Sequence, residues 1–205
     1  MTKKIARRRG RPRDAKSHIA VLDAALQVLE SEGYAAATIE RIAAEAGVAK
    51  QTIYRWWNGK ATLFMEVLAR EAGQSVELPD TGSFNSDVAA LLTGTFAAVS
   101  SKLRPVMRAL AVEVLHDEVF AATMRDVFVQ RRRENVRDLV QKGIRRGELS
   151  NLTDAELVCD ILFGTMWYRL MFDHAKLDKL AAEQLSSVAY AVAVQNPRTP
   201  SIRKV

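Results

Sequence analysis

The chain has 205 residues, of which 48% are hydrophobic and 26% charged, and its formal net charge is +6. This composition is typical of a globular protein that buries a core, and no apolar run approaches the roughly 20 residues that a membrane-spanning helix needs. A single cysteine, Cys159, excludes an intramolecular disulfide. We therefore expect a soluble, cytoplasmic protein with no membrane partner.

The positive charge is concentrated at the start of the sequence. Residues 1–16 hold eight Lys or Arg residues and one Asp, a net charge of +7, so residues 17–205 carry a net charge of −1. A basic segment of this kind indicates a polyanionic partner, either nucleic acid or an anionic membrane surface.

Within this segment, the four residues RGRP at 9–12 resemble an AT-hook. Glycine and proline keep such a motif extended and narrow, so that its arginines can enter an A·T-rich minor groove. We expect Arg9, Arg11 and Arg13 to contact DNA as a disordered arm. The alternative is a solvated run of charge that attracts nucleic acid without specificity.

Helical periodicity runs through the rest of the chain, and no alternating strand pattern of useful length occurs, so we predict an all-α fold. Four short helices are expected first, separated by glycine and Asn-Gly breaks, at 17–32, 38–46, 51–57 and from residue 60. Ser17 is expected to cap the first of these helices and Gly33 to end it.

Residues 73–85 are rich in Gly, Pro, Ser, Asn and Asp, which predicts a linker and a domain boundary. The longer helices expected beyond it are 86–103, 105–115, 117–146, 154–176 and 179–194. Thr153 and Glu156 have the spacing of a capping box at the start of the fourth of these.

The segment AGVAKQTIYRWWNGK, residues 46–60, has the pattern of a helix-turn-helix. Two short helices can cross closely because Ala43 is small, and Gly47 tolerates the positive φ that the turn between them requires. Ile53 supplies an apolar anchor on the second helix, and Val48 can seal the turn. The alternative is a plain helical hairpin with core tryptophans.

In a helix-turn-helix, the leading end of the second helix enters the major groove. Lys50 and Gln51 lie at this end, and their side chains suit guanine and adenine edges respectively. Hydroxyl or ammonium donors suited to phosphate oxygens are expected at Thr38, Thr52, Tyr54 and Lys60. Of the adjacent tryptophans, we expect Trp57 to pack inward and Trp56 to face DNA.

The run ATIERIAAEAGVAKQTIYRWWNGKATLFMEVL closely resembles the N-terminal domain of TetR-family transcriptional regulators, over roughly residues 17–68. The resemblance implies a DNA-binding helix-turn-helix domain joined to an all-helical domain for ligand binding and dimerisation. It also implies a homodimer that represses transcription until a small ligand releases it. The matching positions are Lys50, Gln51, Thr52, Tyr54 and Trp56 on the recognition helix, with Thr38 and Lys60 on phosphate. Trp56 stands where many members carry His, and Trp57 stands where Phe is usual.

Taken with this resemblance, the sequence predicts four segments. They are a basic disordered arm (1–16), a helix-turn-helix domain (17–72), a helical ligand-binding and dimerisation domain (73–194) and a flexible tail (195–205). Ligand in the larger domain would move the helix at 60–72 as a lever and change the spacing of the two recognition helices.

The resemblance places a ligand cavity among the middle helices of the larger domain. The residues expected to line it are Phe96, Met107, Leu110, Val114, Phe128, Arg131, Phe163 and Trp167. Helical spacing puts either Arg131 or Arg132 on the inner stripe. That arginine would snorkel or pair with a neighbour such as Glu113, or it would recognise an acidic ligand.

The last two helices are apolar on more than one face, and the resemblance implies that they form a four-helix dimer interface. The residues expected there are Leu157, Ile161, Gly164, Tyr168, Leu185, Val188 and Val192.

No motif in the sequence indicates catalysis. His18, His116 and His174 match no metal spacing, and neither a phosphate-binding glycine loop nor a nucleophile elbow occurs. We expect no enzyme activity, no metal and no cofactor. The expected partners are double-stranded DNA, a second copy of the chain and a small apolar or amphipathic ligand. The alternatives are an architectural A·T-rich DNA-binding protein that uses the RGRPR arm, and a helical enzyme or small-molecule binder.

Overall fold

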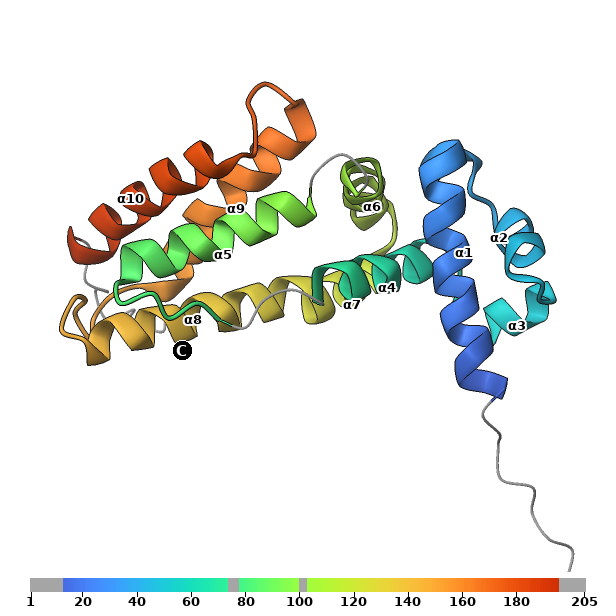
Figure 1. Ribbon diagram of the computed structural model, residues 1–205, viewed down its shortest axis with the longest axis horizontal. Coiled ribbons are helices and arrows are strands. Elements are labelled where there is room, and N and C mark those ends of the chain that lie inside the picture. The colour runs from blue at the N-terminus through green and yellow to red at the C-terminus, as the bar shows by residue number, and fades with distance from the viewer. Residues whose placement is uncertain (1–12, 74–77, 100–102, 196–205) are drawn as a thin grey trace, which may run out of the picture. The chain divides into compact units, whose positions relative to one another are not determined.

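The computed structural model describes residues 13–73, 78–99 and 103–195, and every regular element within them is helical (Figure 1). The predicted all-α class is therefore confirmed. The chain divides into two compact units, residues 1–67 and 68–205.

The first unit is built from three complete helices and the start of a fourth. They are α1 (Arg13–Ala36), α2 (Ile39–Ala46), α3 (Lys50–Tyr54) and α4 (Lys60–Gly73). The helix α1 begins four residues before Ser17, so the expected cap at Ser17 is wrong. Gly33 breaks the regular part of α1 with φ 80° and ψ 167°, as expected for a glycine stop.

A continuous apolar core holds these helices together. Its fully buried members include Val21 and Val28 of α1, Ile42 of α2, Ile53 of α3 and Phe64 of α4. All five side chains are apolar, and Val21 and Val28 lie two turns apart on one face of α1, the 3.6-residue period from which such a helix is predicted.

The second unit contains the longer helices. They are α5 (Phe84–Ala98), α6 (Arg104–His116), α7 (Glu118–Met124), the π-helical turn η1 (Arg125–Val129), α8 (Gln130–Arg145), α9 (Ala155–Phe172) and α10 (Lys179–Gln195). The helix α5 packs against α8 and α10, and α9 also packs against α8 and α10 (Figure 1). The expected helix at 117–146 is interrupted at η1, where the Gln130 N–H bonds the carbonyl of Arg125.

The start of α9 corrects one expectation. Thr153 and Glu156 do not form a capping box, because Asp154 is the N-cap and accepts hydrogen bonds from the backbone N–H groups of Glu156 and Leu157 at 3.0 and 3.2 Å. The Thr153 hydroxyl instead donates to the carbonyl of Ala193 in α10, at 3.0 Å. Thr153 therefore fastens α10 to the segment before α9.

A buried carboxylate joins the start of α5 to the end of α8. Asp87 is 0% exposed and accepts hydrogen bonds from the backbone N–H and the hydroxyl of Thr81, at 2.6 and 2.8 Å. Its other oxygen accepts from Arg146, at 2.6 Å. Burial raises the pKa of Asp87, but the hydrogen bonds from Thr81 and Arg146 outweigh burial and hold that pKa below its ordinary value.

We expect the substitution Asp87→Asn to lower the free energy of unfolding of the second unit by about 3 kcal/mol, because it removes the one fully buried carboxylate among those that pair with Arg146. Since the folded-state pKa is lowered, the stability that Asp87 contributes is complete above its ordinary pKa of about 3.9. That stability is lost as pH falls through the folded-state pKa. Urea unfolding at several pH values measures both effects.

Asp80 is the matched control, since it also pairs with Arg146, at 3.1 Å, but its side chain is 67% exposed. We expect Asp80→Asn to cost less than about 1 kcal/mol. Equal losses for the two variants would show that burial of Asp87 contributes nothing.

Candidate nucleic-acid interface and ligand cavity

The turn between α2 and α3 has the geometry of a helix-turn-helix. Gly47 caps α2 in the left-handed region, with φ 65° and ψ 33°, and the Val48 N–H donates to the carbonyl of Ala43 at 3.0 Å. Ala43 is 4% exposed and Ile53 is 0% exposed, so a small residue and an apolar anchor lie inside the unit. Because residues with a Cβ atom rarely adopt this φ, glycine at position 47 sets the angle between the helices.

The leading end of α3 faces solvent. Lys50 and Gln51 are both exposed, and Tyr54 one turn later is 55% exposed. The Lys50 ammonium lies 2.7 Å from the Glu40 carboxylate of α2. Their hydrogen bond lowers the pKa of Glu40 and raises the pKa of Lys50, so both groups are charged at neutral pH. An ion pair this exposed is weak, and the lysine can exchange Glu40 for another acceptor.

The two adjacent tryptophans differ in how deeply they are buried. Trp57 is 4% exposed, its indole Nε1–H donates to Glu66 of α4 at 2.7 Å, and the His18 ring of α1 stacks on it with ring centroids 4.8 Å apart. Trp56 is half-buried and meets the His18 and Trp57 rings edge-on. The inward position of Trp57 matches the expectation, and only part of the Trp56 ring remains accessible.

The expected phosphate contacts lie in different surroundings. Thr38 is exposed, but its hydroxyl already accepts the backbone N–H of Arg41 at 3.1 Å as the N-cap of α2. Thr52 is half-buried. The Lys60 ammonium donates to the carbonyl of Tyr34 and lies 4.0 Å from the centre of the Tyr34 ring. The structure therefore ties Lys60 to the end of α1.

The basic arm is described only at its end. Arg9 and Arg11 lie outside the described residues. Arg13 is the first residue of α1, so its backbone belongs to a helix and not to the expected disordered arm.

In the second unit, a cavity of about 340 Å³ opens between α9 and the segment formed by η1 and the start of α8. It is lined by Phe128, Val129, Arg132, Arg133, Cys159, Asp160, Phe163, Gly164 and Trp167. Its volume lies at the small end of the range of about 300–1,000 Å³ for ligand pockets. Three of the expected lining residues, Phe128, Phe163 and Trp167, are among these nine.

The other expected lining residues lie elsewhere. Phe96, Met107 and Leu110 are buried in the core of the unit, and Val114 is half-buried away from this cavity. Arg131 is exposed, and Arg132 takes the inward position. Arg132 forms no ion pair with Glu113 or with any other acid of the described segments. Its Nη1 donates to the carbonyl of Phe128 at 3.1 Å.

The other charges beside the cavity are paired. Arg133 bridges Glu156 and Asp160 of α9, and Arg137 donates to Glu156 at 2.6 Å. The hydrogen bond from Arg137 and that from Arg133 lower the pKa of Glu156 against the effect of its burial. Two cations and two carboxylates thus neutralise one another at the rim.

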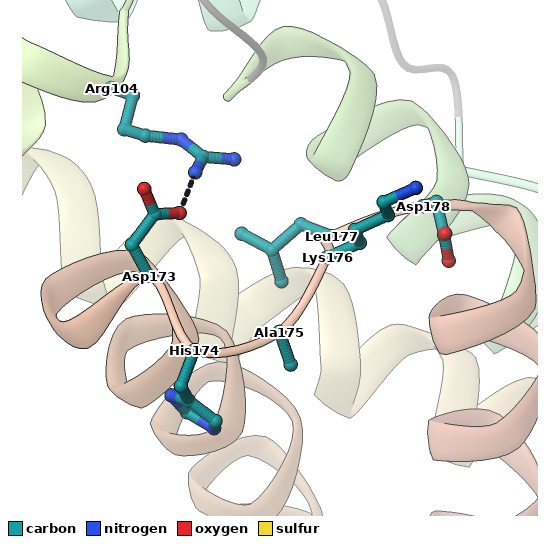
Figure 2. Close-up of a pocket in the computed structure, with 7 residues that line it drawn as sticks. All are labelled: Arg104, Asp173, His174, Ala175, Lys176, Leu177 and Asp178. Atoms are coloured by element: carbon teal, nitrogen blue, oxygen red, sulfur yellow. Dashed lines mark hydrogen bonds and ion pairs between the residues drawn. The ribbon is translucent and has the colours of Figure 1, made fainter.

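A second hollow, of about 350 Å³, lies at the loop after α9 (Figure 2). Its wall is the chain from Asp173 to Asp178 together with Arg104, which points at Asp173 and bonds its carboxylate. Asp173 caps α9 with a φ of 54°. Arg104 is already paired with Asp173. This hollow is therefore better explained as a gap left where the loop after α9 folds back than as a binding site.

The residues expected at a dimer interface lie on the outer side of α9 and α10. Leu157, Tyr168 and Val188 are 41%, 59% and 53% exposed. Ile161, Leu185 and Val192 are half-buried, and Gly164 is exposed at the edge of the cavity. A Cβ atom at Gly164 would meet nothing within 4 Å, so no close backbone approach within this chain requires glycine there.

Sequence reasoning missed His18 and Glu66, which together hold Trp57, and it missed Cys159 and Asp160 beside the cavity. A lone histidine and a lone glutamate carry no pattern that points to one indole ring. The role of Asp160 could have been predicted, because Asp160 and Glu156 lie one turn apart and carry charges opposite to those of the arginine run at 131–133.

Within the described segments, no helix is long and apolar enough to cross a bilayer. The same segments contain no group of three or more His, Cys, Asp or Glu side chains arranged to hold a metal ion.

Comparisons with known proteins agree with this geometry. A family model described as "Bacterial regulatory proteins, tetR family" matches residues 21–67, and one described as "Tetracyclin repressor-like, C-terminal domain" matches residues 78–189. The HTH-type transcriptional regulator YdeS of Bacillus subtilis is 37% identical over 164 residues, which are 80% of this chain and 83% of that protein. The DNA-binding transcriptional repressor TetR of Mycobacteroides abscessus is 30% identical over 164 residues, 79% of this chain and 84% of its own.

Among solved structures, the TetR family transcription regulator SCO0332 superposes with a TM-score of 0.74 at 24% identity, over 86% of this chain and 98% of that one. The described fold, the helix-turn-helix and the two family models that together extend over most of the sequence lead to one assignment. The chain belongs to the TetR family of DNA-binding transcriptional regulators.

Proposed function

We propose that this TetR-family regulator is a ligand-responsive repressor that binds a palindromic operator as a homodimer and releases it when a small molecule occupies the second unit. The observation that carries the proposal is the leading end of α3. It exposes Lys50 and Gln51 on a helix whose position is fixed by a left-handed glycine turn and a buried isoleucine.

The DNA-binding part of the proposal assigns a role to each exposed group of α3. Gln51 would pair with an adenine edge, and Lys50 would leave Glu40 to donate to guanine. Tyr54 and the hydroxyl of Thr38 would meet phosphate oxygens, with the local field at the start of α2 favouring the anion. Trp56 would add its accessible edge to the sugar-phosphate backbone.

Dimerisation follows from the need to read enough bases. One recognition helix contacts only a few base pairs, whereas two helices about 34 Å apart read inverted half-sites in successive major grooves. The outer side of α9 and α10 exposes Leu157, Tyr168 and Val188, side chains that usually lie inside a protein. We infer that these helices meet their symmetry mates in an isologous interface.

The ligand part rests on the cavity beside Phe128, Phe163 and Trp167. A ligand can shift the protein between two arrangements only if it binds one of them better. We infer that occupancy is transmitted through α4, the helix that continues from residue 60 to residue 73. The alternative of an architectural DNA-binding protein is not favoured, because the basic arm is a small part of a chain that matches regulators over most of its length.

Selection of bound fragments from random DNA by the full chain should yield two inverted half-sites. On that operator, we expect Gln51→Ala to weaken binding by about 1–3 kcal/mol per half-site contact and to relax the preference at one base position. Binding to unrelated duplex DNA should be unchanged, since phosphate contacts supply that affinity. Fluorescence anisotropy with both duplexes measures the difference.

Gln27 of α1 is the matched control, because it is an exposed glutamine of the same unit outside the helix-turn-helix. The substitution Gln27→Ala should leave operator affinity unchanged. An operator preference that survives Gln51→Ala combined with Tyr54→Ala would remove α3 as the reading element.

For the dimer, we expect Val188→Glu to raise the dimer dissociation constant at least ~100-fold, equivalent to about 2.8 kcal/mol. Symmetry would bury two unpaired carboxylates in one interface. Sedimentation velocity over a range of protein concentrations measures the change. The control is Val119→Glu on α7, where the valine is 74% exposed. A dimer that tolerates Val188→Glu but not Val119→Glu would place the interface elsewhere.

A further inference from the structure

We propose that the ligand of the cavity between α8 and α9 is a small monoanionic organic acid, with its carboxylate on Arg132 and its apolar body against Phe128, Phe163 and Trp167. This inference deepens the proposed function and rests on it in one respect, namely that this cavity is the regulatory ligand site.

The Arg132 guanidinium has few hydrogen-bond partners within the described chain. A guanidinium has five N–H donors, yet Arg132 makes one hydrogen bond in the described residues, from Nη1 to the carbonyl of Phe128. Its Nε is buried and has no hydrogen-bond partner. Among the described residues, the Nε atoms of Arg104 and Arg146 are also without a hydrogen-bond partner, but both of those arginines pair with a carboxylate, whereas Arg132 pairs with none. A buried cation without a counter-charge is costly, which points to a partner from outside the chain.

Aromatic rings surround the guanidinium. Its Cζ lies 3.4 Å from the centre of the Phe128 ring and 5.9 Å from the centre of the Phe163 ring. A guanidinium in contact with a ring face keeps its N–H donors along its own edge. Two parallel N–H groups on that edge match the two oxygens of a carboxylate. The phenyl rings that hold the arginine would also meet the apolar part of the ligand.

The charges of the residues around the cavity do not balance. Arg133 and Arg137 are neutralised by Glu156 and Asp160, which leaves Arg132 as the cation without a counter-charge in the cavity lining that the structure describes. Desolvation lowers the pKa of Arg132 to about 10, so it remains charged at neutral pH. One uncompensated positive charge fits one negative charge on the ligand.

The neighbouring thiol does not supply that negative charge. Cys159 lines the same cavity, and burial raises the pKa of its thiol to about 11, so it stays neutral near pH 7. Asp160 is held by Arg133 and its side chain is 61% exposed. No acidic group of the described residues therefore neutralises Arg132.

The size and the polarity of the cavity limit the kind of ligand that fits. The cavity of about 340 Å³ is small for a ligand site, and three aromatic rings line it. A phosphate or a nucleotide needs several donors around a larger charge, whereas a single guanidinium in an apolar wall suits a carboxylate on a short alkyl or phenylalkyl chain.

The test uses the full chain and pairs of acid and alcohol with the same carbon skeleton: octanoate with 1-octanol, and 4-phenylbutyrate with 4-phenylbutan-1-ol. Isothermal titration calorimetry, supported by the fluorescence of Trp167, gives the affinities. We expect each acid to bind at least ~10-fold more tightly than its alcohol, and inorganic phosphate to bind more weakly than either acid.

Arg132→Gln should weaken the acids by about 10- to 100-fold and leave the alcohols unchanged. The matched control is Arg131→Gln, which removes the same charge from the exposed neighbouring position and should leave acid binding intact. Equal affinity for acid and alcohol, acid binding that survives Arg132→Gln, binding of phosphate as tight as that of the acids, or failure of both acids to bind at millimolar concentration would each overturn the proposal.

A measurement without ligand separates a binding role from a structural one. If Arg132 is kept for a ligand, Arg132→Met should leave the thermal midpoint of the free protein unchanged or raise it, because it removes an unsatisfied charge. A fall of several degrees would show that the arginine stabilises the fold, and would overturn the proposal.

Operator binding is measured separately. Acids that bind through Arg132 but do not displace the operator would support the ligand class and contradict the ligand response. A chain that recognises no operator would contradict the proposed function and would not alter the outcome of the acid titrations.

Discussion

The geometry of the DNA-binding unit depends on how a helix of five residues is held in place. A helix as short as α3 has no stability of its own, since a single turn repays little of the entropy lost in forming it. Ile53, in the last turn of α3, and Trp57, three residues after its end, are 0% and 4% exposed and anchor the helix in the core. The Nε1–H of Trp57 donates to Glu66 of α4, and His18 of α1 stacks on the same ring, so one indole connects three helices. The exposed side chains of α3 gain a defined direction only because its inner side is anchored in this way.

The ion pairs of the two units differ in how far they are exposed to solvent. Lys50 and Glu40 form an open pair in water, where exchange of one partner for a phosphate or a base costs little. In the second unit, Asp87 with Arg146 and Glu156 with Arg133 and Arg137 form ion-paired networks that join helices far apart in sequence. Removing a member of such a network is expensive because the remaining charge stays partly buried. Arg132 differs from these arginines because it has no carboxylate partner among the described residues.

The helices, the glycine turn and the inward tryptophan could be predicted from sequence, because each depends on local rules. The 3.6-residue period located Ile42 and Ile53 in the core, and Gly47 marked a positive φ. One miss arose where a local rule met a tertiary partner: Thr153 has the right spacing for a capping box, but its hydroxyl bonds Ala193 forty residues away. The choice between Arg131 and Arg132 depended on η1. Its wider turn advances the inner stripe by one residue, so that Phe128, Arg132 and Val136 follow one another at intervals of four. No property of the sequence marked that turn in advance.

The position of the cavity suggests how binding of an acid could affect the dimer. Arg132 lies on α8, whereas Phe163 and Trp167 lie on α9, so an acid held by all three would fix the spacing between these helices. Leu157 and Tyr168, on the outer side of α9, belong to the surface that we infer to meet a partner subunit. One helix therefore carries cavity residues on one side and proposed interface residues on the other. A close-packed helix moves as a body, because its interior resists deformation. A ligand that neutralises Arg132 would favour one placement of α9, and a symmetric interface would apply the same displacement to both subunits of the dimer.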